Sequence, residues 1–393
     1  MKVVQINSVC GSGSTGKICV AVSRLLTERN MENYLLYALG TSDYPLGIRH
    51  GDPRGLKWQI LKAKTLGNYG FQSRNATMAL IRELERIAPD VVHLHNLHSH
   101  NVHLGMLFGY LKEKKIKLFW TFHDCWAFTG YCMYYDMAHC DRWKTGCQNC
   151  PQRKHYSWIF DRSSDLYRKK KELFSGLDLT IITPSQWLAD QVRQSFLGDY
   201  PVKVIHNGID LSLFRPRQSD FRRKYNLAGK FVILGVALGW EPRKGLDVFL
   251  ELAKQLDDRF RIVLVGTNDK IDRQLPENVI SIHRTQNQQE LAEIYSAADV
   301  FLNATREDNF PTVNLEALAC GTPVITFRTG GSPEAIDETC GCVVDCDNLT
   351  ALGDRLRLLC VHNPYSEEAC LARAANFEQN RSFRQYARLY EAE

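Results

Sequence analysis

Short runs of apolar residues alternate with segments of helical periodicity along almost the whole chain. In the first half, the apolar runs lie at residues 3–6, 33–39, 90–94, 117–121, 179–183 and 202–205. Helical patterns lie between some of them, near residues 16–29, 74–87 and 101–113. Strands buried on both faces of a parallel sheet read as continuous apolar runs, and helices usually connect them. The pattern therefore predicts a doubly wound α/β domain.

This rhythm breaks once and then begins again. The segments His206–Asp210 and Phe214–Pro216 interrupt it, and further apolar runs follow at residues 231–236, 261–266, 279–283, 299–303 and 323–327. A chain of 393 residues is also long for a single domain. We expect two doubly wound domains, residues 1–206 and 207–375, with a cleft between them. Residues 376–393 should form a helix that packs back on the first domain.

Composition narrows the class of protein. Apolar residues make up 44% of the chain and charged residues 24%, which is ordinary for a globular protein with a full core. The formal net charge of +5 is too small to indicate a nucleic-acid partner. No apolar run is long enough to span a bilayer, and the opening MKVVQINSVC lacks the apolar centre of a signal peptide. We therefore expect a cytoplasmic location.

The segment 299–321 carries the strongest chemical signal. A strand leads into a polar loop with the adjacent acids Glu307 and Asp308, and a helix then opens near Pro311 and carries Glu316. Free N–H groups and the helix dipole make a helix start an anion site. Carboxylates can hold hydroxyl groups, so this unit suits a sugar nucleotide, which offers both hydroxyls and phosphates. The plainer alternative is an acidic loop before an ordinary helix.

A glycine loop follows the first strand. Residues 11–16 read GSGSTG, which matches the dinucleotide-binding pattern and nearly matches a P-loop. Ile18 stands where a P-loop needs Ser or Thr, and no acid ends the second strand before Asp43. Both alternatives are therefore weakened. A loop of small residues lets the backbone approach a phosphate closely, although a tight strand–helix turn would also use glycine.

Histidines gather where two predicted strands end. His93 and His95 lie in or after the strand at 90–94, followed by Asn96, and the next strand ends at His123 and Asp124. The carboxyl ends of strands in open parallel sheets are where ligands bind. His98, His100 and His103 also lie nearby, but their spacing does not favour a metal site. We expect His95 and Asn96 to line a ligand site, and His93 to be structural.

Three segments together resemble the donor site of the GT-B glycosyltransferases of the retaining family 4. They are GWEPRKG at 239–245, the segment 299–321, and TGGSPE at 329–334. The resemblance implies two Rossmann-like domains and a sugar nucleotide as donor, with no metal cofactor required for catalysis. The family has two glutamates separated by seven residues. Here Asp308 lies eight positions before Glu316 and Glu307 lies one further back, so either acid could contact the sugar.

The resemblance also implies roles for individual residues. His123 would hold sugar hydroxyls or developing charge, with Asp124 orienting its ring, and Arg243 and Lys244 would meet the diphosphate. Asp308 would hold the sugar, and Glu316 the ribose. The remaining donor-binding candidates are Gly13, Gly16, Gly239, Arg284, Glu307, Asn309, Phe310, Pro311, Thr312 and Val313. On the acceptor side, the candidates are Ser14, Thr15, His95, Asn96 and Asp124.

Four cysteines lie in an aromatic-rich insertion near residues 125–160. They are Cys132, Cys140, Cys147 and Cys150, the last two forming a Cys-x-x-Cys pair. Four thiolates can hold a structural zinc ion, and a long loop with little periodicity would gain from such a link. The spacing is wider than in common zinc knuckles, so disulfides and free thiols stay open, although disulfides are rare in the cytoplasm.

We expect a retaining, metal-independent transfer of a sugar to a hydroxyl acceptor, in the synthesis of a bacterial surface polysaccharide. A nucleotide-sugar epimerase and a non-catalytic binding protein of the same fold are the alternatives. The acceptor would be a glycan or a lipid-linked sugar. Weak contact with the inner face of the cytoplasmic membrane would come from two basic clusters, Lys112–Lys117 and Arg168–Lys171. Lysine runs on helices are, however, commonly solvated faces.

Overall fold

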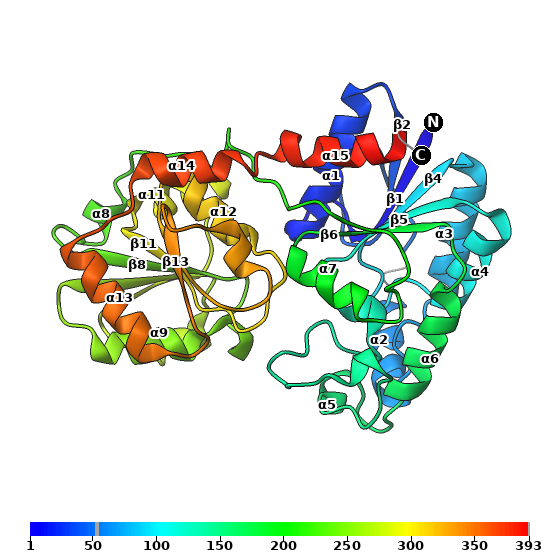
Figure 1. Ribbon diagram of the computed structural model, residues 1–393, viewed down its shortest axis with the longest axis horizontal. Coiled ribbons are helices and arrows are strands. Elements are labelled where there is room, and N and C mark those ends of the chain that lie inside the picture. The colour runs from blue at the N-terminus through cyan, green and yellow to red at the C-terminus, as the bar shows by residue number, and fades with distance from the viewer. Residues whose placement is uncertain (52–54, 392–393) are drawn as a thin grey trace. The chain divides into compact units, whose positions relative to one another are not determined.

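The computed structural model describes residues 1–51 and 55–391. The chain divides into two compact units, which Figure 1 shows. The first unit contains residues 1–206 and 382–393, and the second contains residues 207–381. The predicted division lay at residue 206, but residues 376–381, which we expected to join the first unit, belong to the second.

The first unit is built on a parallel sheet of seven strands in the order β3-β2-β1-β4-β5-β6-β7. The strands are β1 (Lys2–Val9), β2 (Glu32–Leu39), β3 (Gly47–Arg49), β4 (Val91–Leu94), β5 (Lys117–Thr121), β6 (Leu179–Thr183) and β7 (Val202–Val204). Its longer helices are α1 (Gly13–Glu28), α2 (Leu56–Leu66), α3 (Arg74–Ile87), α4 (Leu104–Lys114), α6 (Ser163–Phe174), α7 (Gln186–Arg193) and α15 (Gln379–Glu391), of which the first three residues lie in the second unit. The strand order reverses between β1 and β4, which is the position where doubly wound sheets bind ligands.

The second unit has a parallel sheet of six strands in the order β10-β9-β8-β11-β12-β13. The strands are β8 (Phe231–Val236), β9 (Phe260–Val265), β10 (Val279–Ile282), β11 (Val300–Asn303), β12 (Val324–Phe327) and β13 (Gly341–Val344). Its helices are α8 (Phe221–Lys224), α9 (Leu246–Gln255), α10 (Asp269–Asp272), α11 (Gln288–Ala297), α12 (Thr312–Ala319), α13 (Leu349–Val361) and α14 (Glu367–Ala375). Its order reverses between β8 and β11.

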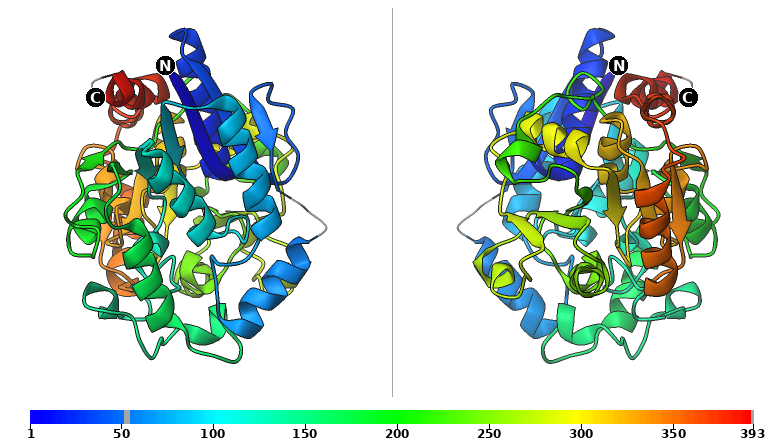
Figure 2. Two further views of the ribbon diagram at one scale, coloured as in Figure 1. Left: turned by 90° about the vertical axis from the view of Figure 1, so that its right-hand side faces the viewer. Right: turned by 90° about the vertical axis from the view of Figure 1, so that its left-hand side faces the viewer.

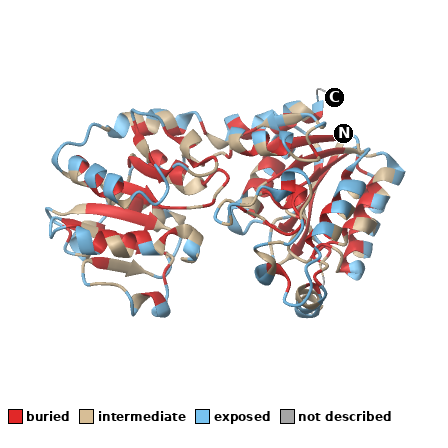
Figure 3. Ribbon diagram, turned by 60° about the horizontal axis from the view of Figure 1, so that its bottom comes forward, coloured by how far each residue is buried: buried red, intermediate tan, exposed pale blue. Residues whose placement is uncertain are grey.

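The central strands of each sheet are buried, as Figure 3 shows by their colour. In β1, Val4 and Ile6 belong to one core cluster of the first unit, whereas Val3 belongs to another. In β8 the neighbours Ile233 and Leu234 likewise belong to different clusters. Side chains alternate between faces along a strand, so a strand that is apolar at every position needs cover on both sides.

The C-terminal helix α15 packs on the first unit, beside α1 and β1 (Figures 1 and 2). Phe383 and Tyr386 of α15 are buried in one cluster with Val3 of β1 and Phe119 of β5. An ion pair of 3.0 Å joins Arg29, which follows α1, to Glu391. This return of the chain end was expected from the family resemblance.

The segment between β5 and α6 has little regular structure. It contains the short helices η1 (Trp126–Phe128), η2 (Arg142–Lys144) and α5 (Arg153–Tyr156). Aromatic side chains give it a core of its own, in which Trp126, Trp143 and Tyr131 are at most 2% exposed. Among the residues that the structure describes, no helix combines the length and the apolar character needed to cross a membrane.

Candidate active site

In the first unit, the polar residues expected at a ligand site meet at the carboxyl edge of β1, β4 and β5. These three strands are neighbours in the sheet. The glycine loop follows β1, His95 and Asn96 follow β4, and His123 follows β5. The side chain of Asn7 in β1 links two of these segments, because its Oδ1 accepts a hydrogen bond of 3.2 Å from the backbone N–H of Asn96.

A chain of hydrogen bonds fixes the proton positions of His95 and His123. The Gln5 side-chain amide donates to the carbonyl of Cys19, so its Oε1 faces His95 Nε2 at 3.2 Å and must accept. His95 Nε2 is therefore the protonated nitrogen, and in the neutral ring Nδ1 is an acceptor. His123 Nε2 lies 3.1 Å from that Nδ1 and must donate to it. The neutral ring of His123 is then left with Nδ1 as an acceptor.

Burial keeps these imidazoles neutral. Desolvation lowers the pKa of His123 to about 4, although the negative charge of Asp124 opposes the shift. It also lowers the pKa of His95 well below its usual range, where the neighbouring His93 and His123 add to the effect. A buried charged form would lose its hydration without gaining an equal partner. His123 is therefore a neutral hydrogen-bonding group at physiological pH, rather than a cation.

His93 has a structural position, as expected. Its Nε2 lies 2.8 Å from Thr121 Oγ1, and its Nδ1 lies 2.5 Å from the hydroxyl of Tyr390 in α15. Both ring nitrogens are therefore occupied inside the protein, and the residue is fully buried. The ring lies 4.1 Å from the ring of His95, measured between centroids, so α15 supports the histidines behind the site.

Asp124 does not orient the ring of His123, and that expectation was wrong. Its Oδ2 lies 2.8 Å from His98 Nε2, and its Oδ1 accepts from the backbone N–H of Trp126 at 2.9 Å. Burial alone would raise the pKa of Asp124, but the charge and hydrogen bond of His98 and the N–H of Trp126 lower it. His95 and Gln5, rather than Asp124, set the orientation of His123. This arrangement could not be predicted from the sequence, because Gln5 lies far from both histidines in the chain.

The glycine loop forms the tight start of α1, which begins at Gly13 and not near residue 16 as expected. The backbone N–H of Gly11 donates to the carbonyl of Gly16 at 3.2 Å. A Cβ at Gly16 would lie 3.1 Å from both that N–H nitrogen and a methyl group of Val9, so a side chain there would crowd the turn. Ser14 is exposed and Thr15 is half-buried, so both hydroxyls lie at the surface of this edge.

In the second unit, a short helix after β8 presents the two expected cations. This helix, η3 (Pro242–Lys244), carries Arg243 and Lys244. Lys244 Nζ forms an ion pair of 2.6 Å with Asp308 Oδ2. Arg243 Nη1 donates to the carbonyl of Glu307 at 3.3 Å. Lys244, expected at the phosphates, and Asp308, expected at the sugar, therefore lie side by side. A sugar-nucleotide donor requires this arrangement, because its sugar is bonded directly to a phosphate.

Arg306 holds this arrangement together, and the sequence reading missed it. Its guanidinium forms ion pairs with Asp247 at 2.7 Å and Asp347 at 2.8 Å, and it donates to the carbonyl of Pro242 at 2.7 Å. Its backbone N–H donates to the carbonyl of Arg243, also at 2.7 Å. Because Arg306 directly precedes the loop acids, these bonds fix η3 against the acidic loop. The position of Arg306 next to two acids could have marked it as a candidate site residue. Its partners are distant in the chain and could not be identified from the sequence.

The helix α12 begins at Thr312, with Pro311 as its N-cap. Thr312 and Val313 are half-buried at this helix start. Phe310 was expected around the sugar, but its side chain is 3% exposed and packs in the core, with its ring 5.6 Å from that of Phe377. Its carbonyl accepts a hydrogen bond of 3.0 Å from Asn207. Phe310 therefore helps to position the loop.

Tyr295 of α11 orients Glu316, which lies on α12. The tyrosine hydroxyl donates to Glu316 Oε2 at 3.1 Å, and the tyrosine is fully buried. Burial and the charge of Glu316 both raise the pKa of Tyr295, so the hydroxyl stays a donor. Sequence reasoning did not find Tyr295, because it lies on another helix and looks like an ordinary core aromatic.

Two further contacts set the loop after β12 against the acidic loop. Asn314 links β11 and α12 to this loop, since it accepts from Asn303 at 2.8 Å and donates to the carbonyl of Ser332 at 3.2 Å. Gly330 has a positive φ of 52°, and a Cβ there would lie 1.7 Å from the carbonyl oxygen of Asp308. Only glycine fits this approach. Gly239, in the loop after β8, also has a positive φ, of 83°.

Arg284, expected near the base of the nucleotide, follows β10 and is exposed. The preceding His283 has its Nε2 2.6 Å from Asp272 Oδ2, and this hydrogen bond raises the pKa of His283. Asn309, also expected around the sugar, is buried.

Comparison with known proteins identifies the chain. Residues 19–213 match the family model described as Glycosyltransferase Family 4, and residues 230–361 match the one described as Glycosyl transferases group 1. The chain belongs to the GT-B glycosyltransferases of family 4. It is thus an enzyme that transfers sugar, and the predicted fold and family are confirmed. The first model ends at residue 213 and the second begins at residue 230, so the two models correspond approximately to the two units.

The relatives and the structural neighbours agree. A protein of Escherichia coli (strain K12) assigned to colanic acid biosynthesis as glycosyl transferase WcaC is 26% identical over 90% of this chain and 89% of its own length. D-inositol 3-phosphate glycosyltransferase of Mycobacterium sp. (strain JLS) is 28% identical, over 37% of this chain and 36% of its own.

Two solved GT-B structures extend over the whole chain. Sucrose-phosphate synthase of Thermosynechococcus elongatus has a TM-score of 0.75 at 18% identity, covering 100% of this chain and 98% of its own. Anabaena HepE, solved in complex with UDP-glucose, has a TM-score of 0.72 at 14% identity, with both chains covered completely. These likenesses support the GT-B fold.

Proposed function

We propose that this enzyme transfers a sugar from a nucleotide-sugar donor to a hydroxyl group of a glycan acceptor in the synthesis of a bacterial surface polysaccharide. The observation that carries the proposal is the contact between Lys244 and Asp308, with Arg243 on the same short helix. A cation pair beside a carboxylate matches the two parts of a sugar nucleotide that must be held during transfer. The colanic acid assignment of the relative supports the polysaccharide product.

The chemistry follows from where charge develops. The bond between the sugar and the diphosphate breaks, so negative charge grows on the leaving phosphate. Arg243 and Lys244 can stabilise this charge in place of a divalent metal ion, because fixed cations act most strongly where charge forms in the transition state. We infer a front-face reaction that retains the anomeric configuration, in which the leaving phosphate oxygen accepts the proton of the attacking hydroxyl.

The carboxylates and His123 have complementary roles in this proposal. Asp308 and Glu316 accept hydrogen bonds from hydroxyls of the sugar and of the ribose. His123 accepts a hydrogen bond from a substrate hydroxyl through Nδ1, the nitrogen that the chain from Gln5 through His95 leaves available. We propose a uridine nucleotide as the donor to test first, because HepE is a GT-B protein solved with UDP-glucose.

We propose that the acceptor is lipid-linked and that the enzyme contacts the membrane through α2 and the loop 158–160. Of the two basic clusters expected for this contact, the one at Arg168–Lys171 is not fully exposed, because its Lys170 is fully buried. Instead Trp58, Trp158 and Ile159 are 66%, 54% and 60% exposed.

The sequence around these apolar side chains is basic. Lys57 and Lys62 of α2 are exposed, and Lys64 lies over the ring of Trp158, with Nζ 5.6 Å from its centroid. The backbone N–H of Trp158 donates to the carbonyl of Lys64 at 2.8 Å, which joins the loop to the helix. Exposed tryptophans with lysines around them suit an anionic lipid surface. We call this surface the α2 patch: Lys57, Trp58, Lys62, Lys64 and 158–160.

A panel of nucleotide sugars tests the proposed activity. A bound donor stabilises the folded protein by RT ln(1 + [L]/Kd), so a thermal shift should identify the preferred nucleotide. Release of nucleotide with and without acceptor then separates the possible activities. A transferase releases nucleotide faster when the acceptor is present, an epimerase changes the donor sugar without transfer, and a binding protein shows the shift without turnover. Either of the last two results would overturn the proposal.

A further inference from the structure

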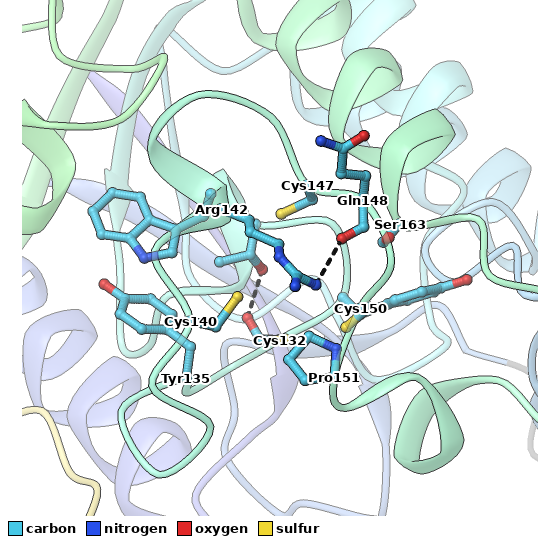
Figure 4. A pocket seen from close by; sticks show the side chains of 12 residues that line it. Cys132, Tyr135, Cys140, Arg142, Cys147, Gln148, Cys150, Pro151 and Ser163 are labelled. Atoms are coloured by element: carbon cyan, nitrogen blue, oxygen red, sulfur yellow. Dashed lines mark hydrogen bonds between the residues drawn. The ribbon is translucent and has the colours of Figure 1, made fainter.

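Four cysteines that are spread over the insertion converge on one small cavity in the first unit. Cys132, Cys140, Cys147 and Cys150 all line it, as Figure 4 shows, and all four are free thiols. The cavity has a volume of about 10 Å³, which is room for about one water-sized atom. Its other walls include Tyr135, Trp143 and Pro151. Four thiols from positions that are distant in the sequence thus line the same small cavity.

The backbone around the cysteine pair is fixed by hydrogen bonds. The N–H of Gly130 donates to Cys147 Sγ at 3.2 Å, and the N–H of Cys150 donates to Asp161 Oδ2 at 2.6 Å. The guanidinium of Arg142 donates to the carbonyl of Gln148 at 3.1 Å (Figure 4). It also donates to the carbonyl of Asn149, the other residue between the cysteines. Asn149 has a positive φ of 46°, so the chain turns sharply there. Both cysteines of this turn line the same cavity.

A buried lysine lies against the same segment. Lys170 of α6 is fully buried, and its Nζ donates to the carbonyls of Trp126, at 2.7 Å, and Thr129, at 3.0 Å. No carboxylate in the described part of the chain forms an ion pair with it. A buried ammonium normally requires a negative partner. Because Thr129 and Gly130 also contact Cys132 and Cys147, an anionic group at the cysteines would provide that charge.

We propose that Cys132, Cys140, Cys147 and Cys150 bind one zinc ion as four thiolates in a structural site. Binding replaces the four thiol protons, which pass to solvent, with one Zn²⁺, and leaves a centre with two net negative charges. Lys170 and Arg142 balance this charge. Zinc accepts four thiolates in tetrahedral geometry, whereas calcium and magnesium need oxygen ligands. A cavity for about one atom suits a single ion rather than an iron–sulfur cluster.

The site would hold the insertion behind the acceptor half of the active site. Cys132 is linked to the segment after β5, since its carbonyl accepts from Thr129 at 2.6 Å and the N–H of Cys125 donates to Met133 at 2.9 Å. Asp124 directly precedes this segment. The zinc ion would therefore fix the insertion to this segment, and so support the position of Asp124 and His98.

The test is metal analysis of the full-length protein, produced with added zinc and purified without a histidine tag or chelator. We expect about one zinc per chain and no iron. Cys147→Ser and Cys150→Ser should each lose most of the zinc. Cys346→Ser is the matched control, because Cys346 is an exposed thiol outside the insertion, and it should keep the metal.

A second measurement does not depend on the folding of any variant. Replacement of the zinc by cobalt in the wild-type protein should give the visible absorption of a tetrahedral cobalt–thiolate centre, together with sulfur-to-cobalt charge transfer. Zinc-free wild-type protein with four reactive thiols in the insertion would overturn the proposal. So would a mass that shows disulfides between these cysteines, bound iron instead of zinc, or equal zinc in the wild type and both variants.

Discussion

At the scale of single residues, Lys244 and Arg243 carry the positive charge that the proposed mechanism needs. We predict that Lys244→Ala and Arg243→Ala each lower kcat by about 10²-fold or more, with a smaller effect on donor affinity, because the charge that they stabilise grows only in the transition state. Steady-state kinetics of sugar transfer checks this. Lys254→Ala is the control, because Lys254 is an exposed lysine of α9 paired with Glu251. Turnover near wild type in both variants would refute the donor site.

The two loop acids should differ in importance. Asp308 faces Lys244, whereas the carbonyl of Glu307 is held by Arg243 and Thr305 and its side chain is 7% exposed. If Asp308 binds the sugar, Asp308→Asn should lower kcat/KM at least about ten-fold, the loss expected for a hydrogen bond to a charged group. Glu307→Gln should cost less. The reverse ranking in the same kinetic assay would place Glu307 at the sugar.

At the scale of elements, we expect acid to destabilise the first unit, because several of its histidines are buried. Burial lowers the pKa of His93 to about 3, and those of His50 and His123 to about 4. In the unfolded chain these histidines take up protons near pH 6.5, so falling pH favours unfolding between about 6.5 and 4. Each contributes up to about 1.4 kcal/mol per pH unit.

Urea unfolding at a series of pH values measures this effect. The free energy of unfolding of the first unit should fall as the pH is lowered from 7 to 5. His283→Gln is a control that should keep the fall in the stability of the first unit, because His283 lies in the second unit and its pKa is raised by Asp272, which opposes such a fall. Constant stability over this range would show that the buried histidines are not held neutral.

Some of these strands and helices could be predicted from the sequence, and others could not. The bounds of β5, β6 and β8 were predicted correctly, because continuous apolar runs between polar turns leave little ambiguity. The strand β3 was missed because it has only three residues, and α2 because its apolar side chains do not follow one buried face.

The site residues that directly follow strands were likewise predicted to lie at the sheet edge. Gln5, Tyr295 and Arg306 were not predicted, since each acts through a contact with residues distant in the sequence. Lys170 looked like part of a solvated basic run, but carbonyls of the insertion surround it. Patterns along the chain thus give the framework and the strand ends, whereas partners across the fold require coordinates.

At the scale of the whole molecule, the α2 patch predicts how the enzyme reaches a lipid-linked acceptor. The full-length protein should sediment with vesicles that contain anionic lipid and be released by high salt, since each basic residue near such a surface contributes about 1 kcal/mol and salt screens it. Trp58→Ser with Trp158→Ser should weaken binding without lowering transfer to a water-soluble acceptor. Lys203→Ala is the control, because Lys203 is an exposed lysine outside the patch, and this variant should bind the vesicles like the wild type. Equal binding of wild type and double variant would reject the patch.

The most direct test of the central claim is transfer of a labelled sugar from a nucleotide-sugar donor to a lipid-linked or glycan acceptor, followed by NMR of the product. We predict a new glycosidic bond with the anomeric configuration of the donor. The wild-type enzyme should form it with metal chelated, and Lys244→Ala should not form it. A product of inverted configuration, an altered donor sugar without transfer, or equal product from Lys244→Ala would contradict it.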